Sequence, residues 1–105
     1  MMAIMADGRE LPLVLEDKAD SVPARGLGGV FIDAWTLAIT LDGKTTYSHV
    51  PKIAGEPSER ISERRFVIDS VALYALGVRE TRDAWGNVLI YGADLPRPAF
   101  AAVAR

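Results

Sequence analysis

The dipeptide Asp42-Gly43 lies between two segments that both favour β-strand. In the upstream segment, residues 30–41 (VFIDAWTLAITL), apolar side chains recur at every second position: Trp35, Leu37, Ile39 and Leu41. Alternation with period two is typical of a strand with one buried face. An Asp-Gly pair between such segments favours a type I′ turn, which needs positive φ at both central residues. The sequence therefore predicts a β-hairpin whose second strand covers residues 44–50 and stops at Pro51.

Two further strands are predicted outside this hairpin. Residues 10–16 (ELPLVLE) are short and rich in branched side chains, which suits a strand with Pro12 at an edge or among its first positions. Residues 88–91 (VLIY) follow a turn at residues 83–87 (DAWGN) and are expected to close the sheet. Residues 17–29 hold Pro23 and several glycines, so we expect a mobile loop that becomes ordered against a partner.

Residues 65–76 are open to two interpretations. Phe66, Val67 and Ile68 favour strand, whereas the alanines and leucines that follow favour a helix ending at Gly77. We predict a strand over residues 65–71 and leave residues 72–77 open between strand and helix. The preceding segment, SERISER, predicts one or two exposed helical turns capped by Ser58.

The length and composition indicate a single folded domain. The chain has 105 residues, of which 50% are hydrophobic and 25% charged, as in ordinary globular proteins. We predict a mainly β fold, a small antiparallel β-barrel or sandwich with one or two short helical segments. Residues 1–10 are expected to be a flexible lead-in, and residues 93–105 a tail.

The residue types argue against catalysis and against metal or cofactor binding. The chain has no Cys and a single His, His49, which has no recognisable nucleophile-and-base motif around it. Glu59 and Glu63 would be a paired-carboxylate site only if both faced a cleft; charged pairs four residues apart are more typical of a solvated helix face. We predict no catalytic, cofactor-binding or metal-binding residues.

Charge and hydropathy argue against nucleic acid and membranes as partners. A formal net charge of −2 leaves no basic excess to neutralise a phosphate backbone, so we expect no sequence-specific nucleic-acid binding. No apolar run approaches the length of about 20 residues that a membrane-spanning helix needs. The first ten residues, MMAIMADGRE, lack the basic and apolar regions of a signal peptide.

A protein interface is the site that the sequence favours most. Trp85, in the polar bend near Arg79 and Arg82, would be a good anchor if exposed, because Trp and Arg are enriched at interface hot spots. Arg25 lies in the loop that we expect to order on a partner. The segment RGLGG that it begins lacks the spacing of a phosphate-binding loop. We therefore predict Arg25, Arg79, Arg82 and Trp85 as interface residues.

The order of these segments resembles that of the small head-tail joining proteins of long-tailed bacteriophages. The resemblance covers residues 11–92: PLVLED, a long Gly-containing loop, WTLAITLDG, a Pro-bearing connector, RRFVIDSV, a polar bend and VLIYG. The chain departs from the usual pattern at SERISER, where that family commonly has a Gly-Asp turn. The resemblance implies a small β-barrel or sandwich that assembles with itself as a ring between portal and tail. Its partners would be virion proteins, and its location the virion, with the host cytoplasm during assembly.

Two other functions stay open at this point. One is a small bacterial protein-binding module, such as a regulator or inhibitor, without catalysis. The other, less supported by the residues, is a small β-barrel enzyme.

Overall fold

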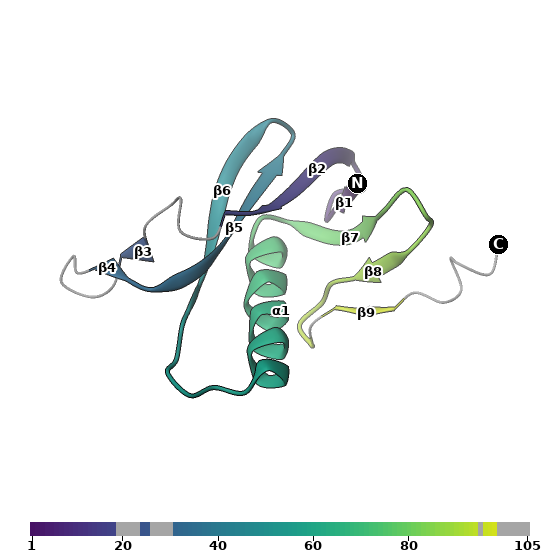
Figure 1. Cartoon of the computed structure of the whole chain (residues 1–105). Coiled ribbons are helices and arrows are strands. Elements are labelled where there is room, and N and C mark those ends of the chain that lie inside the picture. The colour runs from purple at the N-terminus through teal and green to yellow at the C-terminus, as the bar shows by residue number, and fades with distance from the viewer. Residues whose placement is uncertain (19–23, 26–30, 95, 99–105) are drawn as a thin grey trace.

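The computed structural model describes residues 1–18, 24–25, 31–94 and 96–98 (Figure 1). In this part of the chain one helix packs against a mainly antiparallel sheet. The strands are β1 (Met2–Met5), β2 (Glu10–Asp17), β3 (Ala24–Arg25), β4 (Phe31–Ile32), β5 (Ala34–Leu41), β6 (Lys44–Pro51), β7 (Val78–Arg82), β8 (Val88–Ile90) and β9 (Arg97–Pro98). The helix, α1, spans Ser58–Ala75.

The main sheet is open and has the strand order β6-β5-β2-β1-β7-β8-β9, with every neighbouring pair antiparallel. Strand β2 joins its two parts. Glu10, Leu11 and Pro12 pair with β1, whereas the remainder of β2, from Leu13 onward, pairs with β5. In Figure 1, α1 stands between the β5–β6 hairpin and the β7–β8–β9 part, and it contacts β5, β6 and β7. The prediction of a mainly β fold is therefore confirmed, and the described strands form an open sheet.

The central hairpin was predicted correctly. Asp42 has φ +51° and Gly43 φ +79°, so both central residues have the positive φ that a type I′ turn needs. The register pairs Leu41 with Lys44 and continues to Ala34 with Pro51, where β6 ends. The strand predicted over residues 10–16 is β2, and the strand predicted over residues 88–91 is β8.

The core lies between the sheet and α1. Its buried members come from both parts of the sheet and from the helix: Ala3, Met5, Leu13, Ile39, Leu73, Val78 and Tyr91. Leu37 and Leu41 of β5 pack against this cluster, as the alternation had predicted. Burying such side chains contributes about 1.5–3 kcal/mol each relative to leaving them exposed.

The flexible lead-in predicted over residues 1–10 is wrong for Met2–Met5, which form β1 in the middle of the sheet. Ala3 has an exposed fraction of 0% and Met5 is also buried, because alternate residues of β1 face the core. A turn that contains Gly8, with φ +89°, leads directly into β2. The segment is too short and too rich in methionine for periodicity to identify it.

The strand predicted over residues 65–71 is also wrong, because these residues belong to α1. Differences in helix propensity among ordinary residues are at most about 0.7 kcal/mol each, and packing overrides them. Leu73 is buried in the core, with Ala72 and Leu76 packed beside it. The helix thus runs to Ala75, and Gly77, with φ +95°, follows the C-cap residue Leu76, in agreement with the alternative interpretation of a helix that ends at Gly77.

The N-terminus of α1 also differs from the prediction. Ser58 is the first helical residue, and the capping position is held by Pro57, which makes no side-chain cap hydrogen bond. In place of the expected one or two short helical turns, the described chain has one helix of 18 residues.

The predicted loop and tail fall largely outside the described residues. Of residues 17–29, Asp17 ends β2, Lys18 follows it, and Ala24–Arg25 pair with Phe31–Ile32 as a separate two-stranded sheet. Of residues 93–105, Arg97–Pro98 pair with β8. The expected mobility of the loop and the expected behaviour of the tail remain predictions.

Candidate protein-interaction site

The turn between β7 and β8 is fixed by the carboxylate of Asp83. Its Oδ1 accepts hydrogen bonds from the backbone N–H groups of Trp85 and Asn87, each with an N···O distance of 2.9 Å. Its Oδ2 accepts one from the side-chain amide of Asn87 at 2.8 Å. This amide, helped by the backbone donors, lowers the pKa of Asp83 below its ordinary value. The turn predicted at residues 83–87 is therefore present and is held by a charged group.

Trp85 lies in this turn with its side chain in solvent. Its exposed fraction is 86%, the highest of any large hydrophobic residue in the described part of the chain. Burial of a tryptophan side chain removes about 150–250 Å² of its surface from water, which is favourable. The single subunit lacks this stabilisation at Trp85. Exposed Trp is the kind of side chain that becomes an interface hot spot when a partner covers it.

The arginines predicted to accompany Trp85 are held by other groups. The guanidinium of Arg79 lies 3.7 Å from the centre of the Tyr74 ring and donates to the backbone carbonyls of Tyr74 and Val78. The guanidinium of Arg82 pairs with Glu80 at 2.7 Å and lies 3.9 Å from Glu10. Arg82 thus lies next to the turn without bonding to it, whereas Arg79 lies at the other end of β7, against the C-terminal end of α1. The backbone of Arg25 is in β3, and its side chain lies outside what the structure describes.

An apolar cavity of about 270 Å³ lies between α1 and both parts of the sheet. Its lining is mostly aliphatic and aromatic: Met1, Leu15, Leu37, Phe66, Asp69, Ser70, Leu73, Thr81, Leu89 and Tyr91. We call it the helix–sheet cavity. Its mouth includes Phe66, which is 49% exposed.

The polar groups of the helix–sheet cavity have specific partners. The hydroxyls of Thr81 and Tyr91 are 3.2 Å apart and hydrogen-bonded, and burial raises the pKa of Tyr91. The carboxylate of Asp69 accepts a hydrogen bond from Ser48 Oγ at 2.8 Å. Burial raises the pKa of Asp69 above its ordinary value, although Ser48 partly offsets this effect. Asp69 is therefore the one carboxylate in the lining, and it is half-buried.

The helix–sheet cavity could not be predicted from a strand over residues 65–71, because four of its lining residues lie on α1. The helical alternative would have placed the cavity-lining residues Phe66, Asp69, Ser70 and Leu73 on one face of the helix. Phe66, Val71 and Tyr74 are exposed on α1, so part of the apolar surface of the helix faces solvent. Phe66 and Leu73, seven residues apart, are the apolar pair at helical spacing from which the cavity wall could have been predicted.

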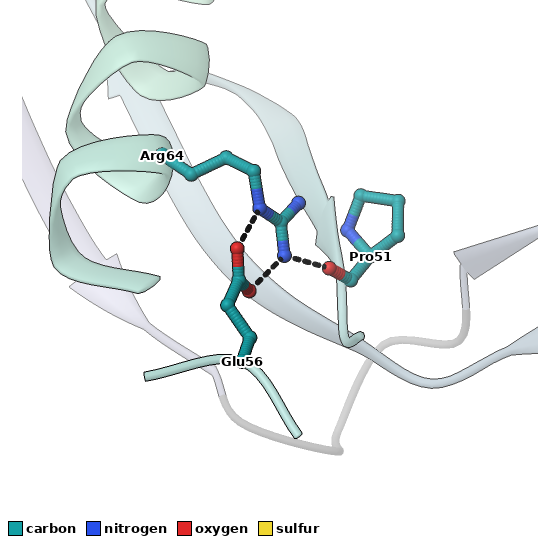
Figure 2. Close-up of polar contacts among 3 residues, drawn as sticks. All are labelled: Pro51, Glu56 and Arg64. Carbon is teal, nitrogen blue, oxygen red and sulfur yellow. Dashed lines mark hydrogen bonds and ion pairs between the residues drawn. The ribbon is translucent and has the colours of Figure 1, made fainter. Parts of the chain in front are cut away.

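A clamp between Glu56 and Arg64 fixes the connector from β6 to α1 (Figure 2). Arg64 Nε donates to Glu56 Oε2 at 3.0 Å, and Nη2 donates to Glu56 Oε1 at 2.7 Å and to the carbonyl of Pro51. The Glu56 side chain is only 6% exposed, and the hydrogen bond from Arg64 lowers its pKa. Arg64 thus joins Glu56 to the end of β6, so we assign the clamp a structural role.

The other candidates from the sequence lie apart from the cavity and the turn. Glu59 and Glu63 are exposed on the first turns of α1. His49 is half-buried on β6, where its Nδ1 is hydrogen-bonded to the hydroxyl of Thr36 at 2.9 Å. Within the described ranges, no group of three or more His, Cys, Asp or Glu side chains is arranged to hold a metal ion. Nor does the described part of the chain contain a helix long and apolar enough to cross a membrane.

Comparison of the chain with protein-family models, with curated proteins and with solved structures finds no match.

Proposed function

We propose that this chain is a structural virion protein of a phage or prophage. In this role it joins head and tail as an oligomeric ring between portal and tail, and is present in the host cytoplasm during assembly. The observation that carries the proposal is Trp85, 86% exposed on a turn fixed by three hydrogen bonds to one carboxylate. A tryptophan side chain has only two χ angles, so on a fixed turn it loses little conformational entropy when a partner covers it, and this favours association.

Three other features support assembly. Phe66, Val71 and Tyr74 leave apolar surface exposed on α1. The strands at the two ends of the sheet order, β6 and β9, have backbone groups available for further pairing. The order of sequence segments from residue 11 to residue 92 resembles that of head-tail joining proteins.

The sheet of the single chain is open, so the predicted barrel or sandwich becomes part of this proposal. An open sheet with one eight-residue edge strand, β6, leaves room for a neighbouring subunit to extend or close it. We propose that the barrel-like or sandwich-like arrangement arises in the ring, from strands of adjacent copies. The role requires portal, adaptor or tail proteins as partners, and it requires no catalysis, cofactor, membrane or specific nucleic-acid sequence.

Native mass spectrometry of the purified chain over a range of concentrations tests the proposal. We expect one closed oligomer with more than two copies, and we expect Trp85→Ala to shift the population toward monomer. Val14→Ala is the matched control, because Val14 is 58% exposed on β2, away from the turn. A chain that remains monomeric at all concentrations and binds no portal or tail protein contradicts the proposal and favours the small bacterial protein-binding module.

A further inference from the structure

The helix–sheet cavity has the size of an aromatic side chain. An apolar cavity of about 150 Å³ in a protein accepts benzene. The volume here is about 270 Å³, which leaves room for the larger indole ring. Side chains from α1, from β2 and β5, and from β7 and β8 form its walls, so an inserted ring would contact both parts of the sheet.

The polar groups of the cavity also suit an indole. The indole Nε1–H is a hydrogen-bond donor and never an acceptor, so a buried Trp needs an acceptor within reach. Asp69 lines the cavity, and Ser48 occupies its Oδ1 with one hydrogen bond. An ionised carboxylate has about four acceptor positions, so Asp69 has capacity for a second donor.

The chain itself carries a side chain of this description on its surface. Trp85 is 86% exposed, so it does not occupy the cavity of its own subunit. The turn that carries it is held by Asp83 and Asn87, so the backbone from which the ring projects is fixed. A formal net charge of only −2 opposes the close approach of two copies weakly.

We propose that Trp85 of one copy inserts its indole into the helix–sheet cavity of a second copy, where its Nε1–H donates to Asp69. This inference rests on the proposed ring and names the contact that forms it. The inserted group and the cavity are different surface regions, so the contact is heterologous, and repeated contacts form a ring if the rotation between copies closes.

Fluorescence in a Trp35→Phe background tests the insertion, because the chain has only two tryptophans and Trp85 is then the single emitter. The substitution keeps an aromatic ring beneath Lys52 and Arg65. As the protein concentration rises through the assembly range, we expect the emission to move to shorter wavelength and acrylamide quenching to fall. Emission that stays that of a solvated indole in the assembled protein overturns the inference.

Two substitutions on α1 provide a matched pair. Phe66 lines the mouth of the cavity and is 49% exposed, whereas Val71 is 56% exposed and does not line it. We expect Phe66→Glu to weaken association about 30-fold or more, as loss of a hot spot does, and Val71→Glu to leave it nearly unchanged. Equal effects of the two substitutions overturn the assignment of this cavity. Circular dichroism and Tm confirm that both variants are folded.

Mixing two variants tests the contact directly. The Trp85→Ala chain retains the cavity without the indole, and the Phe66→Glu chain retains the indole with a blocked cavity. We expect each alone to be monomeric and the mixture to form a 1:1 heterodimer. If the wild type forms a ring but the mixture does not pair, the inference fails and the proposed function stands.

A free indole compound tests whether the cavity binds an indole independently of assembly. N-acetyl-L-tryptophanamide added to the Trp85→Ala chain should shift the NMR signals of Thr81 and Leu89 in the cavity wall, and it should not do so in the double variant with Phe66→Glu. A wild-type chain that is monomeric at all concentrations overturns both the ring and the second copy as occupant. In that outcome, binding of the compound would show that the cavity takes an indole from another protein.

Discussion

Three hydrogen bonds join Asp83 to Asn87 across the β7–β8 turn. The backbone N–H of Asp83 donates to the carbonyl of Asn87 at 3.1 Å, and the backbone and side-chain N–H groups of Asn87 donate to the carboxylate at 2.9 and 2.8 Å. Trp85 lies between these two residues and is tied to the same carboxylate. The position of the most exposed described aromatic therefore depends on one carboxylate and one amide.

Asn87→Ala should loosen this turn without unfolding the chain. It removes the side-chain hydrogen bond that is the largest cause of the lowered pKa of Asp83, so that pKa should rise toward 3.8. A carboxyl group with a pKa lowered by folding stabilises the fold above its unfolded pKa, and this contribution is lost as the pH falls through the folded value. The difference in stability between wild type and variant should thus be present at pH 7 and vanish below the lowered pKa. NMR titration of Asp83 and melting curves at both pH values measure it.

Trp85→Ala should leave the stability of the subunit almost unchanged. The side chain is exposed, and surface substitutions usually change the free energy of unfolding by no more than about 0.5 kcal/mol. Leu73→Ala is the contrasting variant, because Leu73 is 3% exposed in the core and its truncation should cost about 2–5 kcal/mol. Denaturant unfolding of the monomeric proteins compares them, and a loss of several kcal/mol for Trp85→Ala would show that Trp85 supports the fold.

Gly77→Ala should destabilise the chain more than Gly8→Ala. Both glycines have positive φ, +95° and +89°, where a side chain costs about 1–2 kcal/mol. At Gly77 the new Cβ would also lie 3.2 Å from the terminal methyl of Met5, whereas at Gly8 nothing lies within 4 Å. The extra loss at Gly77 should appear as a lower Tm, since about 1 kcal/mol corresponds to roughly 4–8 °C in a domain of this size. Equal Tm values would mean that Met5 moves aside without cost.

Asp69→Asn should stabilise the subunit at neutral pH. Burial raises the pKa of Asp69 in the folded chain above the ordinary value of 3.8, so the folded state binds the proton more tightly than the unfolded state. The stability of the wild type is therefore reduced as the pH rises from 3.8 through the raised pKa. Asparagine does not ionise and can still accept the hydrogen bond from Ser48, so the advantage of the variant should grow over this range. Tm values of the wild type and the variant at pH 3.5 and at pH 7 give the difference in stability at both ends of this pH range. A difference that does not change with pH would contradict the raised pKa of Asp69.

Glu56→Gln should lower the Tm more than Glu59→Gln. Glu56 binds Arg64 through both carboxylate oxygens, and Arg64 in turn binds the carbonyl of Pro51. Glu59 is exposed in the first turn of the same helix and serves as the control. The effect should disappear at low pH, because the lowered pKa of Glu56 means that its contribution is lost as the pH falls below 4.5 through the folded value. Thermal melts at pH 7 and pH 3 compare the variants.

Local chemistry was sufficient to predict the central hairpin. Asp42-Gly43 specifies its own turn, and the side chains of β5 alternate over enough residues to define one face. The helix could not be predicted in the same way, because Phe66, Val67 and Ile68 favour strand locally and only the contacts of Leu73 with the distant sheet decide against it. Strand β1 was missed for the same reason: four residues have little periodicity, and their burial comes from partners far along the chain.

The candidate site likewise has one part that could be predicted from the sequence and one part that could not. The exposure of Trp85 follows from its place in a polar turn, which the sequence contains in full. The helix–sheet cavity does not follow, because its walls come from segments that are separated in sequence and meet only in the folded chain.

The central place of β1 also determines when the subunit can finish folding during synthesis. Met2 is paired with Pro12 on one side and with Arg82 on the other, so the second partner leaves the ribosome 70 residues after the first. Pairing between segments so distant in sequence is slow, and until β7 arrives the free edge of β1 is open to other chains. We therefore expect nascent chains that stop before residue 78 to aggregate through β1, and a chaperone that covers this edge to raise the yield of the complete protein.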